Sequence, residues 1–149
     1  MDLPFKEKEI NDQNYWNWNG FKIFWSVKGE NNAYPIIFLH GFGASSLHWR
    51  KNLNYFAKNN FAAYSLDLIG FGNSDQPGIR EIGKLDNGVW RDQVQDFINQ
   101  VIRPKNSKKV ILIGNSLGAL VALTCAVSLE SEIATVIASP LPDQIQKIK

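Results

Sequence analysis

Several residue types on which particular protein classes depend are scarce in this sequence. Its 149 residues include a single cysteine, Cys125, so no disulfide can form within the chain. The lack of a disulfide framework favours a reducing compartment. No charge-free stretch approaches the length of a transmembrane helix, and residues 1–12 lack the apolar core of a signal peptide. We therefore expect a protein of the cytoplasm or a comparable interior space.

An excess of charge of one sign is also lacking. The 16 lysine and arginine residues nearly balance the 14 acidic residues, which leaves a net charge of +2. This small charge predicts neither a nucleic-acid partner nor binding to an anionic membrane, and Lys147 and Lys149 fit a solvated chain end. With 44% hydrophobic residues and no repeat or linker, residues 1–149 are expected to form one globular domain with its own core.

Two glycine-rich segments lack part of the motif that binds nucleotides. Residues 41–46 and 70–75 each begin with G-x-G, but neither has the third glycine of G-x-G-x-x-G, and no P-loop motif is present. A dinucleotide cofactor is therefore disfavoured.

Hydrophobic runs alternate with amphipathic segments along the chain. Aromatic residues over 15–25, interrupted by Asn19-Gly20, predict a β-hairpin. Further buried strands are expected over residues 35–39, 61–68, 110–113 and 133–140. Helices are expected after Ser45 or Ser46, after Asp86 or Asn87, and from Leu117, with a long loop over residues 76–88. This order predicts an α/β fold, a doubly wound and mostly parallel sheet with an N-terminal antiparallel hairpin.

Three residue types outside the glycine-rich segments have both a structural and a functional interpretation. The hairpin tryptophans, such as Trp16 and Trp18, fit either a ligand platform or packing onto the sheet edge, and the pattern favours packing. Cys125 falls among small apolar residues of the last helix and is predicted to be a buried apolar side chain. His48 is expected at the surface.

Residues 114–118, Gly-Asn-Ser-Leu-Gly, match the G-x-S-x-G pattern of a nucleophile elbow. Many glycine-flanked serines are ordinary turn residues, but the expected strand before this motif and helix after it favour a nucleophile. A tight turn between strand and helix would expose the Ser116 hydroxyl, and flanking glycines give the turn space. The first N–H groups of the helix are unpaired, so the N–H of Leu117 is a candidate oxyanion donor.

Residues 40–45, His-Gly-Phe-Gly-Ala-Ser, follow the expected strand 35–39 directly. Small residues let this backbone turn closely, and the N–H of Phe42 is the second candidate oxyanion donor, with its ring in the pocket wall. His40 is either a general base or a side chain that fixes the loop by hydrogen bonds, and its place at the end of a buried strand favours the second role. Asp67 and Asp75 are expected to fix the next glycine-rich loop by hydrogen bonds to its amides.

Three segments together resemble the N-terminal half of an α/β-hydrolase. They are His-Gly-Phe-Gly at 40–43, the segment 67–74 and the Gly-Asn-Ser-Leu-Gly segment, and the resemblance extends from Trp16 to Pro142. Segments 16–20, 40–45 and 90–93, together with Asn115, are more narrowly similar to the pheophytinase-like hydrolases of cyanobacteria and chloroplasts. The narrower resemblance implies a bulky apolar ester as substrate.

The same resemblance implies residues that this sequence does not contain. In that family the serine is followed by an acid and then a histidine, but no histidine follows Ser116, and Asp143 lies where the family begins its cap. The resemblance implies that a cap and further strands follow residue 149. A fragment, a second chain with the missing half and a pseudoenzyme are the alternatives. The open sheet edge predicts poor solubility or association with a partner.

The predicted activity is that of a serine hydrolase acting on a carboxylic ester or related acyl compound, in which Ser116 attacks the carbonyl. The N–H groups of Leu117 and Phe42 would hold the oxyanion, and no metal or organic cofactor is expected. One alternative is a non-catalytic module that binds a small molecule or a protein. Another is acyl transfer or cofactor-free addition to a carbonyl on the same fold.

Overall fold

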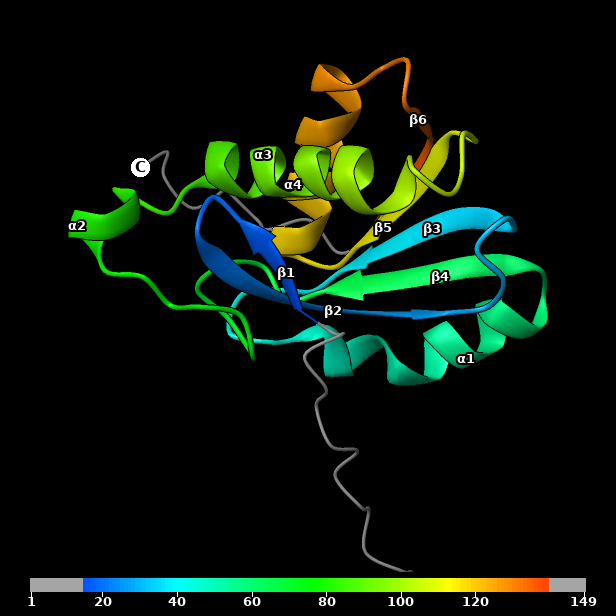
Figure 1. Cartoon of the computed structure of the whole chain (residues 1–149), viewed down its shortest axis with the longest axis horizontal. Coiled ribbons are helices and arrows are strands. Elements are labelled where there is room, and N and C mark those ends of the chain that lie inside the picture. The colour runs from blue at the N-terminus through cyan, green and yellow to red at the C-terminus, as the bar shows by residue number, and fades with distance from the viewer. Residues whose placement is uncertain (1–14, 140–149) are drawn as a thin grey trace, which may run out of the picture.

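Six strands form one mixed sheet in the spatial order β1-β2-β4-β3-β5-β6 (Figure 1). The computed structural model describes residues 15–139. The strands are β1 (Tyr15–Trp18), β2 (Phe21–Lys28), β3 (Tyr34–Leu39), β4 (Phe61–Leu66), β5 (Val110–Gly114) and β6 (Ile133–Ala138). Strands β4, β3, β5 and β6 run parallel, while β2 is antiparallel to both β1 and β4. The predicted α/β architecture is confirmed.

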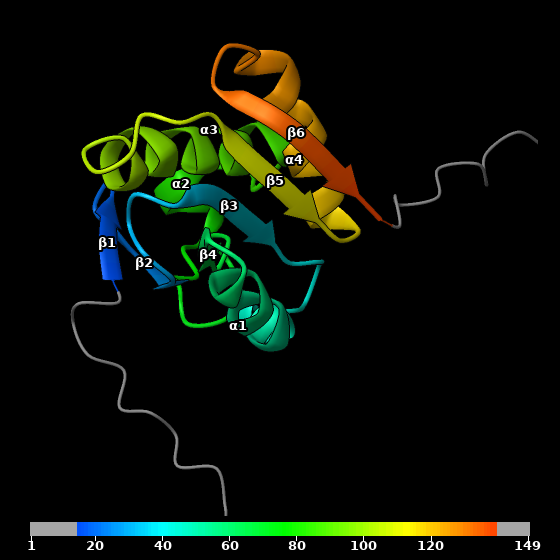
Figure 2. The same cartoon turned by 90° about the vertical axis from the view of Figure 1, so that its right-hand side faces the viewer.

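Helices cover the two faces of the sheet unequally. The helical elements are a 3-10 segment (Ser46–Trp49), α1 (Arg50–Lys58), α2 (Ile79–Ile82), α3 (Asn87–Phe97), a π-helical segment (Ile98–Ile102) and α4 (Leu117–Ser128). Helix α1 lies on one face, and α3 and α4 lie together on the other (Figures 1 and 2). The long loop predicted over residues 76–88 contains α2, so that prediction was too simple.

The N-terminal hairpin forms as predicted and occupies one edge of the sheet. Asn19 and Gly20 have positive φ values of 51° and 88°, which suits a tight hairpin turn. The indole N–H of Trp18 donates to Asp96 at 2.8 Å, and that of Trp16 donates to Gln100 at 3.1 Å. These bonds tie the hairpin to the helical segment above it, which supports packing as the role of both tryptophans.

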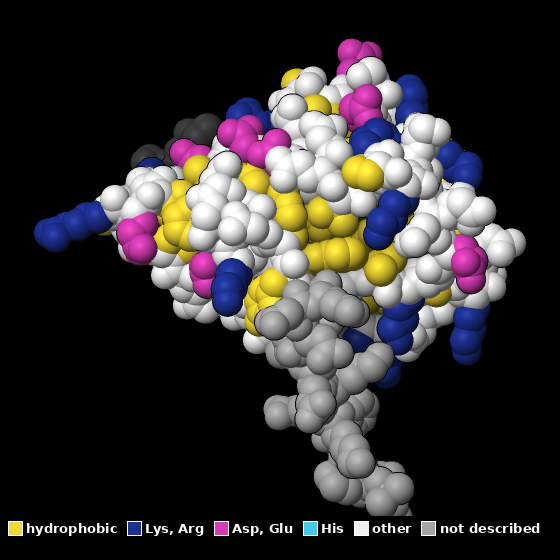
Figure 3. All heavy atoms as spheres, in the orientation of Figure 1, with side chains coloured by type: hydrophobic (Ala, Val, Ile, Leu, Met, Phe, Trp, Pro, Cys, Tyr) yellow, Lys and Arg dark blue, Asp and Glu magenta, His cyan; other side chains and the backbone are white. Residues whose placement is uncertain are grey.

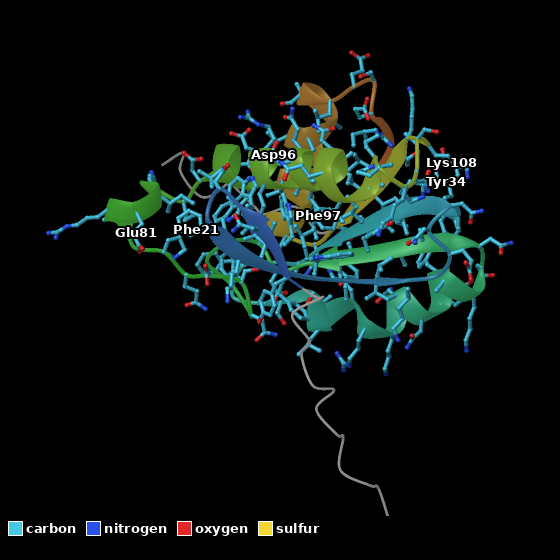
Figure 4. All side chains as sticks on the ribbon, in the orientation of Figure 1. Phe21, Tyr34, Glu81, Asp96, Phe97 and Lys108 are labelled. Atoms are coloured by element: carbon cyan, nitrogen blue, oxygen red, sulfur yellow. The ribbon has the colours of Figure 1, made fainter. Side chains whose placement is uncertain are left out.

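The larger core lies between the sheet and helices α3 and α4. Phe97 of α3, labelled in Figure 4, is fully buried there, and Trp16, Trp25 and Tyr64 contact its ring at centroid distances of 5.6, 5.6 and 6.0 Å. Figure 3, in the orientation of Figure 1, shows hydrophobic side chains gathered across the middle of the side of the molecule in view. A smaller core on the other face joins Trp49 and Leu53 to the sheet. Strands β3 and β4 are therefore buried on both faces.

One of the predicted helix caps is confirmed and another is not. The Asp86 carboxylate accepts hydrogen bonds from the N–H groups of Gly88 and Val89 at 2.9 and 3.2 Å, so Asp86 caps α3. Ser45 precedes the 3-10 segment but its side chain makes no capping bond, so the predicted serine cap was wrong. The N–H of Ser46 donates instead to the Asp67 carboxylate.

The last strand is less buried than its apolar sequence predicts. Ala134, Thr135 and Ile137 of β6 are exposed, so the prediction of a buried strand was wrong for this element. Ile111 and Ile113 of β5 are only half-buried, although burial on both faces was expected. They pair with Thr135 and Ile137 and pack against the edge of the smaller core, on the face of the sheet that carries α1. Pro140, Asp143, Lys147 and Lys149 lie outside the described residues.

None of the helices in the described part of the chain is long and apolar enough to cross a membrane.

Candidate active site

Two loops meet at the carboxyl ends of the neighbouring parallel strands β3 and β5. Leu39 pairs with Gly114 at the ends of these strands, and the N–H of Asn115 donates to the Leu39 carbonyl at 3.1 Å. A Cβ placed on Gly41 would lie 3.4 Å from the Cβ of Ser116. The loop of residues 40–46 (the first loop) therefore lies directly against residues 114–118 (the elbow). Carboxyl ends of parallel strands are where such sheets place ligands.

The elbow is a sharp turn with an unusual backbone conformation at its centre. Ser116 has φ 54° and ψ −113°, a backbone conformation that residues other than glycine rarely adopt. Its carbonyl accepts the N–H groups of Ala119 and Leu120 at 3.0 and 3.2 Å, which starts α4. No hydrogen bond from the N–H of Leu117 is found within the described residues. This N–H lies at the first turn of α4, where the helix dipole favours negative charge.

Glycines make the elbow possible because the backbone packs too closely for a side chain. A Cβ on Gly118 would lie 2.6 Å from the carbonyl carbon of Leu39 and 2.7 Å from the His40 oxygen. A Cβ on Gly114 would lie 2.5 Å from the N atom of Ala119. Real Cβ atoms do not approach backbone atoms this closely. The two flanking glycines of the motif thus have a steric function.

The first loop turns immediately after β3. The N–H of Ala44 donates to the Gly41 carbonyl at 3.2 Å, and Gly43 has a positive φ of 69° within this turn. The N–H of Phe42 makes no hydrogen bond to another described residue, and its side chain is 78% exposed. Gly41 lies against Ser116, and Phe42 and Leu117 are the residues that follow these two in the sequence. The two candidate N–H donors therefore belong to neighbouring segments of backbone.

His40 is fully buried and uses both ring nitrogens inside the loop framework. Its Nδ1 lies 2.8 Å from the Gly41 carbonyl oxygen, and its Nε2 lies 3.0 Å from the N–H of Leu68. This pattern assigns the proton to Nδ1, because Nε2 must accept. Burial lowers the pKa of His40, against the opposing effects of the Gly41 carbonyl and Asp67. The predicted loop-fixing role is confirmed.

Asp67 connects the first loop to the loop that follows β4, residues 67–75. One oxygen of its buried carboxylate accepts the N–H of Ser46 at 2.6 Å, and the other accepts the N–H of Asn73 at 2.7 Å. The predicted role of Asp67 is confirmed. Asp75 differs from its prediction, because its carboxylate accepts the N–H of Lys22 in β2 at 2.8 Å rather than an amide of its own loop.

Two residues of α3 hold the same loop from the other side, and the sequence identified their segment, 90–93, for its resemblance alone, without assigning either residue a role. The Gln93 side chain, fully buried, accepts the N–H of Ile69 at 3.0 Å. The indole N–H of Trp90 donates to the Ile69 carbonyl at 3.0 Å. Apart from that resemblance, the sequence signal for Gln93 was an amide side chain beside Val94, a residue of the helix's apolar face. Both groups satisfy loop amides that would otherwise be buried without partners.

The Phe71 ring packs against two aromatic rings of the first loop and one of α3. The Phe71 ring meets the Phe42 ring edge-to-face at 5.3 Å and an interplanar angle of 76°. It also meets the His40 ring at 5.5 Å and the Trp90 ring at 5.9 Å. Phe71 was not a predicted site residue, because nothing in its local sequence indicates which loop it contacts.

A hollow of about 550 Å³ lies away from these loops, between the hairpin turn, α2 and α3. Phe21, Glu81 and Asp96, labelled in Figure 4, are among its lining residues. Two of its acidic side chains already have partners. Glu81 accepts the N–H of Gly78 and Asp96 accepts the Trp18 indole. The hollow shares no lining residue with the first loop or the elbow.

Other chemistry finds little support in the described residues. Residues 15–139 contain no group of three or more His, Cys, Asp or Glu side chains placed to hold a metal ion. Cys125 is buried, and burial raises the pKa of its thiol to about 12. A thiol with this pKa stays protonated at neutral pH, which confirms the prediction of a buried apolar side chain.

The sequence matches a known family and several related proteins. The family of the alpha/beta hydrolase fold matches residues 34–141. The chain is 30% identical over 122 residues to putative esterase/lipase 2 of Mycoplasma pneumoniae, which covers 81% of this chain and 43% of that protein. It is 29% identical over 124 residues to epoxide hydrolase 4 of Mus musculus, covering 83% of this chain and 33% of that protein. It is 30% identical over 122 residues to the 1-acylglycerol-3-phosphate O-acyltransferase ABHD5 of Sus scrofa, covering 80% of this chain and 33% of that protein.

A solved structure shows the same fold. The thioesterase domain from the curacin biosynthetic pathway superimposes with a TM-score of 0.75 at 21% identity, covering 86% of this chain and 45% of that chain. The present chain therefore spans less than half the length of each of these proteins. The comparisons do not separate out the pheophytinase-like group to which the sequence is narrowly similar.

Proposed function

Because the chain belongs to the alpha/beta hydrolase fold family, we propose that it is a serine hydrolase whose nucleophile is Ser116. The observation that carries this proposal is the strained backbone of Ser116, at φ 54° and ψ −113°, held between two glycines where a strand becomes a helix. Strain of this kind costs roughly 1–3 kcal/mol and persists where the surrounding structure enforces it. In a nucleophile elbow it lifts the hydroxyl clear of the backbone.

The proposed reaction is acyl transfer to water. The Ser116 Oγ bonds to the carbonyl carbon, its proton passes to a general base, and the alcohol leaves with that proton as the C–O bond breaks. Water then attacks the acyl-serine ester and releases the acid. The N–H groups of Phe42 and Leu117 would donate to the oxyanion in both steps, and neither has another partner within the described residues. This chemistry needs no metal or organic cofactor.

The general base is proposed to come from polypeptide outside this sequence. The sequence has two histidines, and His40 already uses both ring nitrogens for Gly41 and Leu68. His48 lies exposed on the 3-10 segment, with its ring against Trp49. A serine without its base keeps only the modest catalysis that oxyanion donors and binding provide. The chain alone is therefore expected to be weakly active or inactive.

The same polypeptide has a docking position on the sheet. Strand β6 pairs with β5 on one side, and its other edge has no strand partner among the described residues. Beside that edge, Ile137 is 50% exposed and Ile111 and Ile113 are half-buried. Open apolar edges of this kind pair readily with further strands. We propose association through this edge with the remainder of the hydrolase domain, either further along the same chain or on a second one.

The proposed substrate is a small molecule, an apolar ester, in the cytoplasm. Relatives include proteins named as an esterase/lipase, an epoxide hydrolase and an acyltransferase, all larger than this chain. The narrower similarity to pheophytinase-like hydrolases favours a bulky apolar ester. An acyltransferase would use the same Ser116 chemistry with an alcohol in place of water, and the relative of that name supports it as a second candidate.

Labelling with a fluorophosphonate probe tests the nucleophile. The chain, its Ser116→Ala variant and the chain extended by its following reading frame would be compared, with Ser128→Ala at an exposed position of α4 as the matched serine control. We expect the extended chain and its Ser128→Ala form to label, and Ser116→Ala to remain unlabelled. If neither the chain nor its extended form labels, Ser116 is not a nucleophile. The proposal of a non-catalytic binding module then replaces that of a hydrolase.

A further inference from the structure

Phe42 presents a large apolar surface beside the proposed nucleophile. Its side chain is 78% exposed, and the preceding residue, Gly41, lies against Ser116. Leaving a phenyl ring in water forgoes about 2 kcal/mol of hydrophobic stabilisation. A single exposed apolar side chain is common on protein surfaces, so exposure alone assigns no role. The surroundings of the ring distinguish it.

Phe71 fixes one side of the Phe42 ring and leaves the other free. The two rings meet edge-to-face at 5.3 Å, and Phe71 is itself held by ring contacts with His40 and Trp90. The Phe71 backbone is bonded at both ends, donating to the Leu68 carbonyl at 2.9 Å and accepting from the N–H of Ser74 at 3.2 Å. For Phe42, by contrast, Phe71 is the one ring contact within the described residues. A rigid support thus holds an exposed ring.

Two titratable side chains close to Phe71, His40 and Asp67, offer no free charge to the surface formed by Phe42 and Phe71. His40 behind it is buried with a lowered pKa and stays neutral at neutral pH. The Asp67 carboxylate is buried and directed at the amides of Ser46 and Asn73. A charged substrate group would therefore lose water at this wall and gain no partner from His40 or Asp67, whereas an apolar or aromatic group would gain contact area.

We propose that the Phe42 ring, held by Phe71, is the wall on which an aromatic or branched apolar group of the substrate packs, and that Phe71 is the positioning residue for this wall. The proposal rests on the proposed function for the reaction itself, and it adds the side chains that select the substrate. Phe71 acts through Phe42, because its own ring is already engaged by three neighbours.

Ketones test the wall separately from the chemistry, because they cannot be hydrolysed. In the Ser116→Ala chain no bond to serine can form, so binding reports packing alone. NMR titrations of the whole chain with 4-phenyl-2-butanone and 2-butanone would give both dissociation constants and the amides that shift. We expect 4-phenyl-2-butanone to bind at least tenfold more tightly, with the largest shifts at residues 41–43 and 71.

Removal of the Phe42 ring should abolish this preference. In Ser116→Ala/Phe42→Ala the two ketones should bind within about twofold of each other. Tyr55 is the matched control, because it is 65% exposed and meets one ring, Phe56, edge-to-face at 5.5 Å. Tyr55→Ala should leave the preference unchanged. An unchanged preference in Phe42→Ala, or no detectable binding of either ketone, would overturn the proposal.

A double-mutant cycle tests the role of Phe71. Phe71→Ala should reduce the preference about threefold to fivefold on its own and have no further effect when Phe42 is already alanine. Phe71→Leu keeps most of the buried volume and supplies a folded variant if Phe71→Ala unfolds. A merely structural role would lower the melting temperature and leave the ketone preference of the folded protein intact, which contradicts positioning. If the preference holds but the extended chain does not react with fluorophosphonate, the hydrolase proposal fails and the apolar binding site remains.

Discussion

The first loop and the elbow lie side by side, yet they are held by different kinds of interaction. Buried side chains fix the first loop, with Asp67 accepting the Ser46 amide and His40 bridging Gly41 and Leu68. The elbow is fixed by the absence of side chains, since Gly114 and Gly118 let the backbone of α4 pack onto β3. One loop is therefore sensitive to the loss of a polar group and to pH, and the other to added volume. Four predictions test this difference.

The largest effect is expected from Gly118→Ala. The added methyl group would lie within 2.6–2.7 Å of backbone atoms of Leu39 and His40, so strand β3 and helix α4 would have to separate. We expect a loss of at least about 4 kcal/mol in the free energy of unfolding, measured by urea denaturation. Gly43→Ala is the control, because its positive φ is strained but its Cβ would meet no atom within 4 Å. Its cost should be about 1 kcal/mol. Equal losses at both positions would remove the distinction.

Asp67→Asn should have the next largest effect. The variant keeps the shape but loses the charge and one acceptor, so the amide of Ser46 or Asn73 loses its partner in a buried place. Hydrogen bonds to charged groups contribute about 1.5–3 kcal/mol each, and we expect a loss of about 2–3 kcal/mol. Asp75→Asn, whose bond to the Lys22 amide is exposed, should cost less than about 1 kcal/mol. Hydrogen exchange should accelerate at Ser46 and Asn73 in the first variant alone.

The pH dependence of unfolding should distinguish the first loop from the elbow. Burial lowers the pKa of His40 below its ordinary value of 6.5, so the unfolded chain binds a proton more readily than the folded one. This stabilisation is present above pH 6.5 and is lost as the pH falls, by up to about 1.4 kcal/mol for each pH unit until the folded pKa is reached. Denaturation at pH 7.5 and 5.5 should show this loss. The loss of stability at low pH should be missing in His40→Gln and present in the variant of the exposed histidine, His48→Gln. If His40→Gln kept the loss, another group would be responsible for it.

The smallest effect, and the one of opposite sign, is expected from Ser116→Gly. Glycine adopts φ 54° without strain, although it adds freedom to the unfolded chain. We expect a net gain of about 1 kcal/mol over the unsubstituted chain in urea denaturation. Ser128→Gly, within the last turn of α4, should instead lose stability. A loss in Ser116→Gly would show that the serine is unstrained and would weaken the proposed function.

Local sequence predicted the elements that depend on neighbouring residues. Asn19-Gly20 predicted the hairpin turn, Asp86 was one of two expected caps of α3, and Gly114 and Gly118 predicted the elbow. In each case the atoms that interact lie within a few residues of one another or share one turn. Periodicity did not reveal that β6 is exposed, because an apolar run of six residues looks the same in a central strand and in an edge strand.

The sequence by itself determined the kind of fold and the position of the strained serine, because turn geometry and hydrophobic periodicity are short-range properties. Tertiary structure alone decided which distant groups meet. Asp67 reaches Ser46 across 21 residues of sequence, and Phe71 reaches the ring of Phe42. These contacts form because parallel pairing of β3 with β4 and β5 aligns the carboxyl ends of all three strands. Residues that are far apart in the sequence are thereby brought together at one edge of the sheet.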